Sequence, residues 1–298
     1  MMAGVLFTDP ARGGESRLKF VKGHGTGNDF VILPDLDFSL DLTPELIRAL
    51  CDRHRGIGGD GVLRVVRSAK HPDAADQAAD AEWFMDYWNA DGSFAELCGN
   101  GVRVFTRYLV ASGLAVASED GLPIATRAGV VRAVIGSPTI AVQMTTPSVY
   151  GASTATVGAL TVPGVAVDCG NPHLVCELHD GLTLRSLDLL RPPAYDHGFY
   201  PSGVNVEFVV PGEPVEHADL HVHMRVYERG SAETLSCGSG ALAVGAVALR
   251  DAGRSAGVVA IDVPGGRLTV THAADGQWWL AGPAVLVASG EVDLAALV

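Results

Sequence analysis

Hydrophobic and polar positions alternate most regularly over residues 219–227. The pattern sets four apolar residues against four polar ones: Leu220, Val222, Met224 and Val226 against His221, His223, Arg225 and Tyr227. Alternation with a period of two is typical of a strand that buries one face. Short apolar runs predict further strands at residues 18–22, 30–33, 62–66, 83–88, 124–128, 130–135, 140–144, 160–168, 204–210 and 278–287. The chain is therefore expected to be rich in strands.

Two longer segments have the spacing of helices instead. One follows Gly101 and ends at Gly113, with apolar residues at Val102, Val104, Phe105, Tyr108, Leu109 and Val110. The other, residues 239–250, is small and apolar on all sides, which indicates a helix covered over its whole surface. Thr43 and Pro44 suit an N-cap and a first helical position, so another helix is expected there, with Cys51 on its core face. A short helix is expected near residues 184–190.

The two long helices are preceded by the same motif. Cys98-Gly-Asn-Gly101 and Cys237-Gly-Ser-Gly240 each place a cysteine directly before the helix. Strands and glycine-rich turns recur around both motifs, and such an internal repeat predicts two similar domains. We expect an α/β (α+β) fold of two pseudo-symmetric domains. Each is a mostly antiparallel sheet wrapped around a central helix, and the active site lies in the interdomain cleft.

Breaks in the apolar pattern indicate where the domains divide. Residues 1–17 are expected to form a loose N-terminal extension. Residues 145–154 interrupt the pattern with small and polar residues, so we place the N-terminal domain at 18–148 and the C-terminal domain at 149–298. Residues 68–81, rich in alanine and aspartate, predict a surface loop.

The position of the two cysteines has a chemical consequence. At a helix start, unpaired backbone N–H groups and the positive end of the dipole stabilise an anion. We therefore expect each thiol pKa to fall below its free value of about 8.5. To invert a carbon that bears an amino group and a carboxylate, a base removes the α-proton from one face and an acid delivers one to the other. A thiolate and a thiol serve both directions by exchanging roles.

Composition narrows the classes of partner. The chain has 298 residues and a net charge of −13, which argues against nucleic acid or a membrane surface as partner and favours a small-molecule substrate. The five cysteines form no C-x-x-C pair, and residues 1–17 lack the apolar core of a signal peptide, so reduced thiols in a cytoplasm are expected. No apolar run is long enough to predict a membrane span.

Other segments resemble cofactor-binding or metal-binding motifs but lack residues that those motifs require. The glycine-rich segments 24–30 and 55–61 lack the dinucleotide fingerprint and the Lys-Ser/Thr of a phosphate-binding loop. Cys169, Cys176, His173 and His179 do not have the spacing of zinc ligands. We therefore expect no cofactor and no metal.

Six motifs in order resemble the diaminopimelate epimerase family. They are His24-Gly-Thr-Gly-Asn-Asp-Phe30, Asn89-Ala-Asp-Gly-Ser93, Cys98-Gly-Asn-Gly101, Gly170-Asn-Pro-His173, Glu228-Arg-Gly230 and Cys237-Gly-Ser-Gly240. The resemblance runs from about Leu18 to the end of the sequence. It implies a cofactor-independent homodimeric enzyme that interconverts LL- and meso-diaminopimelate in lysine and peptidoglycan precursor biosynthesis.

The same resemblance implies roles for individual residues. Cys98 and Cys237 would be the two acid/base catalysts, and His173 and Glu228 would adjust their pKa values. The residues implied to contact substrate are Asn28, Asn89, Gly99, Asn100, Asn171, Asn205, Glu228, Arg229, Gly238 and Ser239. One departure is Gly61, where many members have a glutamine, so that side-chain contact is absent or made by water.

Other functions remain open at this stage. A proline or hydroxyproline racemase also uses paired cysteines, but the polar residues Asn89, Asn205 and Arg229 favour a substrate with a second charged head. A thiol redox protein would need a resolving cysteine nearby, and none is evident. A catalytically inactive amino-acid-binding protein would not need both thiols.

Overall fold

The structure is a computed structural model that describes residues 17–118, 120–136, 138–179 and 181–297. Apart from Arg17, which begins the first strand, the predicted N-terminal extension lies outside these residues. In the first half of the chain the elements are β1 (Arg17–Gly25), β2 (Asn28–Pro34), α1 (Pro44–Cys51), β3 (Gly61–Arg67), η1 (Ser68–Lys70), η2 (Ala75–Gln77), β4 (Trp83–Asn89), α2 (Gly99–Ala111), β5 (Leu122–Thr126), β6 (Gly129–Ile135) and β7 (Thr139–Met144). The strands and helices predicted for this half are confirmed.

In the second half the elements are β8 (Ser148–Val157), β9 (Leu160–Asp168), β10 (Pro172–Glu177), η3 (Leu184–Ser186), β11 (Ala194–Tyr195), β12 (Asn205–Pro211), β13 (Leu220–Glu228), β14 (Ala232–Thr234), α3 (Gly238–Asp251), β15 (Gly257–Val263), β16 (Gly266–His272), β17 (Trp278–Pro283), β18 (Val285–Asp293) and η4 (Leu294–Leu297). The alternating segment forms β13, and the long apolar segment forms α3. The predicted mixed α/β fold with two repeated halves is confirmed.

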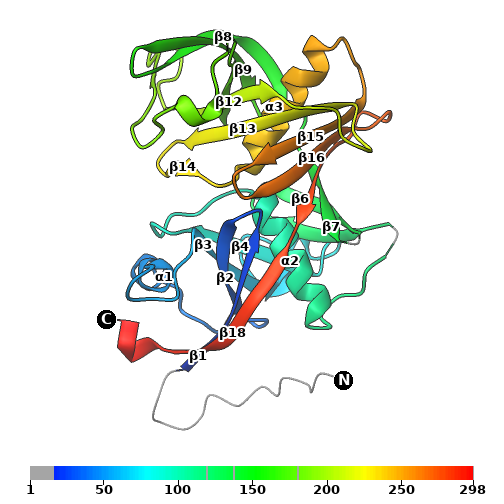
Figure 1. Cartoon of the computed structure of the whole chain (residues 1–298). Helices are drawn as coiled ribbons and strands as arrows, with labels where there is room; N and C mark the ends of the chain where they lie inside the picture. Colours follow the sequence, from blue (N-terminus) through cyan, green and yellow to red (C-terminus); the bar gives the residue numbers. More distant parts are fainter. Residues whose placement is uncertain (1–16, 119, 137, 180, 298) are drawn as a thin grey trace.

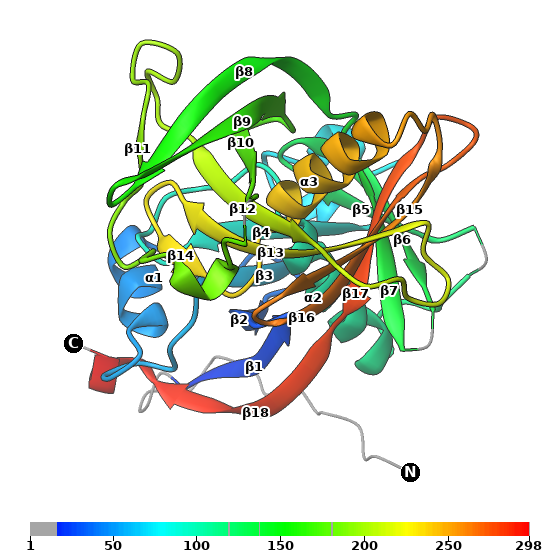
Figure 2. The same ribbon diagram turned by 45° about the horizontal axis from the view of Figure 1, so that its top comes forward.

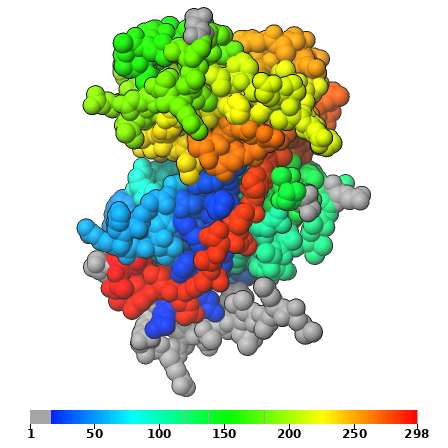
Figure 3. Space-filling view, in the orientation of Figure 1, coloured from blue at the N-terminus to red at the C-terminus, as the bar shows by residue number. Residues whose placement is uncertain are grey.

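Figure 1 shows two lobes, one with β1 to β4 around α2 and one with β8 to β16 around α3. Figure 2 shows α3 lying against the strands of its own lobe. The two lobes are joined by strand pairing, because β17 pairs with β7 and β18 pairs with β1. In Figure 3 the orange and red atoms of these C-terminal strands run across the junction between the lobes. The division at residues 148 and 149 stays a prediction, and the pairing of β18 returns the chain to its first half.

Within the described part of the chain, most strand pairings are antiparallel, but four are parallel: β2 with β3, β4 with β5, β10 with β12, and β13 with β15. Each central helix is buried by the strands that surround it. In α3, small residues allow this close cover: a Cβ added to Gly245 would lie 2.6 Å from Val270 Cγ1 of β16. Among the described residues, none of the helices has the length and hydrophobicity needed to cross a membrane.

Two local predictions are wrong, for identifiable reasons. Residues 184–190 form only the short η3, because Asp188 Oδ1 accepts the backbone N–H of Leu190 and Arg225 Nη1 donates to the Leu187 carbonyl at 3.0 Å. Residues 68–81 are more than a surface loop, because Ala74 and Ala81 are buried in a small apolar cluster.

Candidate active site

Both motif cysteines are N-caps of the central helices. Cys98 precedes α2, and its Sγ accepts the backbone N–H of Gly101 at 3.3 Å. Cys237 precedes α3, and its Sγ accepts the backbone N–H of Gly240 at the same distance. The repeated sequence motif therefore forms the same capping hydrogen bond at both helix starts.

The two helix starts converge on one place. A Cβ atom added to Gly99 would lie 3.0 Å from Leu280 Cδ2, and one added to Gly238 would lie 3.0 Å from the same methyl carbon. The side chain of Asn100 bridges the halves directly, because its Nδ2 donates to the carbonyl of Ser236 at 3.2 Å. Residues far apart in the sequence thus form a single site around two cysteines.

The surroundings of Cys98 are polar and include a buried cation. Asn28 Oδ1 lies 3.8 Å from Cys98 Sγ and accepts a hydrogen bond from Asn100 Nδ2 at 3.2 Å. Arg103, in the second turn of α2, is fully buried, and its charge favours the thiolate of Cys98. Burial lowers the pKa of the guanidinium to about 10. Among the described residues, no carboxylate forms an ion pair with Arg103.

Sequence reasoning missed Arg103 and its partner Thr26. Arg103 Nη2 donates to Thr26 Oγ1 at 2.9 Å, and Ser236 Oγ donates to the same hydroxyl at 3.1 Å. Thr26 has a positive φ of 53°, a conformation that is uncommon for a residue with a Cβ. A buried chain of side chains therefore connects α2 to the residue before Cys237.

The surroundings of Cys237 are acidic. Its Sγ lies 3.6 Å from Ser239 Oγ and also forms a hydrogen bond with Glu228. The Glu228 carboxylate accepts a second hydrogen bond from the Thr234 hydroxyl. Burial raises the pKa of Glu228 above its ordinary value, and its hydrogen bonds to Thr234 and Cys237 oppose that rise. Glu228 is thus in direct contact with one of the two thiols.

The predicted fall in the thiol pKa values is wrong for this structure. Burial raises the pKa of Cys98 to about 11, although backbone N–H groups of Gly101 and Asn100 act in the expected, lowering direction. Burial also raises the pKa of Cys237, and the negative charges of Glu228 and Glu207 add to the rise. Desolvation therefore outweighs the helix N-terminus at both sites.

His173 lies close behind the Cys237 site, on β10. Its Nδ1 is 2.7 Å from Glu207 Oε1, and its Nε2 is 3.1 Å from Asn171 Oδ1. Both His173 and Glu207 are fully buried, and a Cβ on Gly240 would lie 2.6 Å from Glu207 Oε1. The structure thus brings Asn171 and His173 together, and the ring of His173 contacts Glu207 rather than a sulfur atom. An effect of His173 on a thiol pKa stays a prediction.

Glu207 is a further residue that sequence reasoning missed. The signal was present, because an acidic residue interrupts the apolar strand Val204 to Val210. Burial raises the pKa of Glu207, while the neighbouring His173 opposes the rise. A charged type at a buried strand position indicates a paired or functional group rather than a solvated one.

Three residues of the predicted set remain, and one of them, Asn205, is buried. Arg229 is exposed; Asn205 Oδ1 accepts its backbone N–H at 2.9 Å, and its Nη1 donates to the carbonyl of Ser202 at 2.8 Å. Asn89 donates to Ser93 Oγ at 3.0 Å within its own turn. Asn205 and Arg229 are therefore brought together, whereas Asn89 has no hydrogen bond to either thiol among the described residues.

The departure at Gly61 has a structural explanation. A side chain at this position would collide with the carbonyl oxygen of Trp88, and its Cβ would lie 2.7 Å from the ring of Tyr87. Burial raises the pKa of Tyr87, and the negative charges of Cys98 and Glu228 add to the rise. Tyr87 thus fills the space beside Gly61, and sequence reasoning did not identify it.

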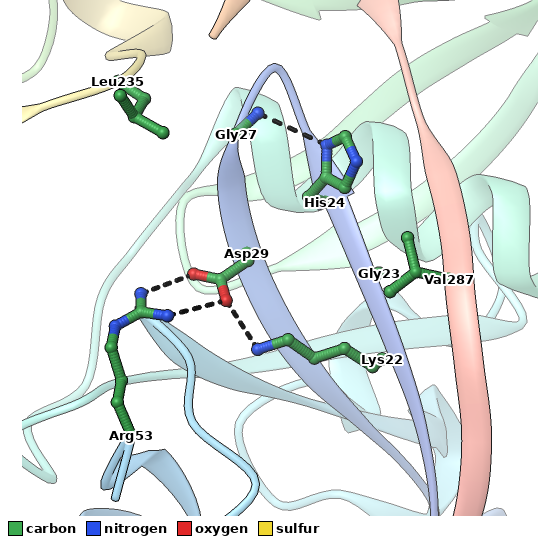
Figure 4. Close-up of a pocket in the computed structure, with 8 residues that line it drawn as sticks. All are labelled: Lys22, Gly23, His24, Gly27, Asp29, Arg53, Leu235 and Val287. Carbon is green, nitrogen blue, oxygen red and sulfur yellow. Dashed lines mark hydrogen bonds and ion pairs between the residues drawn. The ribbon is translucent and has the colours of Figure 1, made fainter.

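A pocket of about 340 Å³ opens beside the Asn28 turn (Figure 4). Its charged side chains already have partners, because both Lys22 and Arg53 point at the carboxylate of Asp29. Arg53 also binds Asp60, whose other oxygen accepts Asn28 Nδ2 at 2.8 Å. This network holds Asn28 in place beside Cys98.

Solved structures with this fold span several activities. The chain matches a phenazine biosynthesis protein of the PhzF family from Bacillus anthracis with a TM-score of 0.66 and 19% identity, over 93% of this chain and 99% of that one. It matches a hydroxyproline epimerase from Agrobacterium vitis, solved with bound trans-4-hydroxy-L-proline, with a TM-score of 0.63 and 15% identity, over 93% of each chain. At such identities the likeness establishes the fold alone.

Sequence comparison is more specific. The chain is 50% identical to the diaminopimelate epimerase of Streptomyces coelicolor, over 94% of this chain and 97% of that protein. It is 45% identical to the diaminopimelate epimerase of Mycolicibacterium smegmatis, over 92% and 96%. The family model described as diaminopimelate epimerase matches residues 20–150 and 165–294. This chain therefore belongs to the diaminopimelate epimerase family.

Proposed function

We propose that the protein interconverts LL- and meso-diaminopimelate by a two-base mechanism in which Cys98 and Cys237 act on opposite faces of one α-carbon. One observation carries the proposal: two cysteine-capped helix starts pack against the same methyl group of Leu280. A single capped cysteine would supply only a base or only an acid, whereas inversion needs both.

The backbone supplies the binding site for the reacting carboxylate. The first N–H groups of each helix have no acceptor within the helix, and those groups belong to Gly99 and Asn100 in α2 and to Gly238 and Ser239 in α3. They bind the substrate carboxylate at the positive ends of both dipoles. Negative charge grows on that carboxylate as the α-proton leaves, so these N–H groups stabilise the transition state more than the ground state.

The charges around the thiols favour different starting roles. At Cys98 the charge of Arg103 favours the thiolate and opposes that of Glu228, whereas at Cys237 both Glu228 and Glu207 disfavour it. In the proposed cycle Cys98 therefore loses its proton first, and Cys237 begins as the acid. Because Glu228 forms a hydrogen bond with Cys237, it is placed to exchange that proton with the outside.

A second charged end of the substrate accounts for the polar side chains of Asn205 and Arg229. Diaminopimelate carries an amino group and a carboxylate at both ends, and a guanidinium binds a carboxylate with two parallel hydrogen bonds. Arg229 supplies this group, with its backbone held by Asn205. Proline has no distal head, so the exposed Arg229 favours diaminopimelate over proline as the substrate.

Incubation with LL-diaminopimelate in deuterium oxide tests this function. We expect deuterium at one α-carbon together with formation of the meso isomer, followed by mass spectrometry and chiral chromatography. L-Proline and trans-4-hydroxy-L-proline serve as control substrates and should remain undeuterated. Inversion of a control amino acid with no inversion of diaminopimelate would assign the site to another substrate.

We further propose that the enzyme works as a homodimer in the cytoplasm and binds no nucleic acid. All five cysteines are free, which supports a reducing compartment, and the net charge of −13 disfavours phosphate backbones. Size-exclusion chromatography with light scattering measures the mass of the assembly, and a monomer mass at working concentration would reject the dimer.

A further inference from the structure

A group of metal-ligating side chains lies in the second lobe, toward the end of β13 that is opposite Glu228. His221 and His223 project from the same face of β13, and Asp262 projects from β15, which runs parallel beside it. Their nearest ligand atoms all lie within 4.8 Å of one another. Figure 1 shows β13 alongside β15 and β16 in this lobe.

The ring of His221 is fixed in an orientation that leaves one nitrogen for a cation. Its Nδ1 lies 2.6 Å from the carbonyl oxygen of Glu213, and because a carbonyl only accepts, Nδ1 must carry the hydrogen. Nε2 of the neutral ring then has a lone pair, yet it lies 2.9 Å from Asp262 Oδ2. A Cβ added to Gly212 would lie 2.4 Å from Nδ1 of this ring, so a residue with a side chain would not fit there. A proton or a metal ion on Nε2 is needed to make this contact favourable.

The spacing of the three ligands suits a metal ion. Zinc binds imidazole nitrogen and carboxylate oxygen at about 2.0–2.2 Å, so two ligands of a tetrahedral ion lie about 3.4 Å apart. Asp262 Oδ2 is 2.9 Å from His221 Nε2 and 3.8 Å from His223 Nδ1, values on either side of that separation. The side chain of His223 is 44% exposed, which leaves the site open to ions from solvent.

We propose that His221, His223 and Asp262 bind one divalent transition metal ion of the zinc class, with water completing the coordination. Two imidazole nitrogens and one carboxylate favour such an ion over magnesium or calcium, which prefer oxygen ligands. The hydrogen bond from His221 to Glu213 is the outer contact that commonly orients a histidine ligand.

Arg267 competes with this ion for the carboxylate of Asp262. It donates to both oxygens of Asp262, at 2.6 and 2.8 Å, and its half-exposed side chain is free to move. The ion displaces Nη2 from Oδ2, while Nε keeps its bond to Oδ1. The site is distinct from the catalytic centre, because Glu228 is five residues beyond His223 on β13, about 17 Å along a strand. The bound ion links β13, β15 and the segment at Glu213, and so stabilises the folded state.

Zinc binding by the full-length Cys98→Ser/Cys237→Ser protein tests the proposal, since this background removes the two active-site thiols as rival ligands. After treatment with a chelator and dialysis, the protein should bind one zinc ion per chain by equilibrium dialysis, and its Tm should rise with zinc. Failure to bind zinc would show that a proton alone occupies His221 Nε2 and would overturn the proposal.

Variants separate this site from adventitious binding. His223→Ala should weaken zinc binding tenfold or more and abolish the rise in Tm. The matched control is His179→Ala, because His179 also lies 3.8 Å from a carboxylate, that of Glu177, but belongs to no group of three ligands among the described residues. Arg267→Gln should tighten zinc binding. Equal affinities for His223→Ala and the parent, or weaker binding by Arg267→Gln, would contradict the assignment.

Discussion

The two helix starts have the same backbone but different charged neighbours. Each cysteine caps its helix with the same 3.3 Å hydrogen bond, but the fifth residue after Cys98 is the buried Arg103, whereas the fifth residue after Cys237 is the buried Leu242. Carboxylates lie on the other side, since Glu228 is hydrogen-bonded to Cys237. A repeated fold has thus kept the geometry that inversion needs and has made the two thiols unequal in acidity.

The largest expected effect comes from removing either thiol. Cys98→Ala and Cys237→Ala should each lower kcat/KM for LL-diaminopimelate by on the order of 10² to 10⁴-fold, because each removes one of two proton-transfer groups. Cys176→Ala is the control, since its buried thiol lies in a separate apolar cluster. Steady-state kinetics in both directions measure this. Full activity in either of the first two variants would remove that cysteine from the mechanism.

The next effect concerns the cation on the Cys98 side. Arg103→Met should raise the pKa of Cys98, so that alkylation of this thiol by iodoacetamide at pH 9 slows by about tenfold for each pKa unit. Alkylation of Cys237 should not change, and this is the readout that a general loss of structure would not give. Arg107→Met, one turn further along α2, is the control because Arg107 is partly exposed. Peptide mass spectrometry resolves the two rates.

An effect of opposite sign is expected at Glu228. Its negative charge raises the pKa of both thiols, after the larger effect of burial, so Glu228→Gln should lower both pKa values and speed alkylation at both sites. The change should be greater at Cys237, which Glu228 contacts directly. Slower alkylation at Cys237 would contradict the effect assigned to the charge of Glu228.

The smallest expected effect is on alkaline stability. A thiol whose folded pKa lies above its unfolded value of about 8.5 contributes stability that is complete below that pH and is lost as pH rises through the folded pKa. For Cys98 this window runs from about pH 8.5 to about 11. At Cys237 the charges of Glu228 and Glu207 add to the rise in pKa that burial causes. Cys237→Ser should therefore reduce the loss of stability at high pH more than Cys98→Ser does. Urea unfolding at pH 8 and pH 10.5 compares the two variants, and the reverse order would contradict the assigned difference.

The sequence was sufficient for the parts that depend on local pattern. The duplicated Cys-Gly-x-Gly motif before two apolar runs predicted both N-caps, and alternation predicted β13. Arg103 could not be predicted in the same way, because an arginine in a helix is usually solvated, and only the folded sheet shows that this one is enclosed. The role of Thr26 could not be predicted either, because its hydroxyl accepts a hydrogen bond from Ser236, which is 210 residues away.

The thiol pKa values show a second limit of what can be predicted from the sequence. Sequence identified the helix N-terminus, which lowers a thiol pKa, but it carried no measure of burial, which raises it. The structure supplies both, and the larger one determines the sign at Cys98 and Cys237. A motif can therefore identify candidate reacting groups while leaving open the protonation state in which they rest.

The pairing of β18 with β1 has a consequence for how the chain folds during synthesis. β1 forms an antiparallel ladder with residues 285–293, so one side of the first lobe has no partner until the ribosome has made the whole second lobe. Until then, the β1 edge exposes unpaired N–H and C=O groups to other nascent chains. The half of the protein that is made first is thus completed last, and chaperones that shield strand edges should matter most for this half.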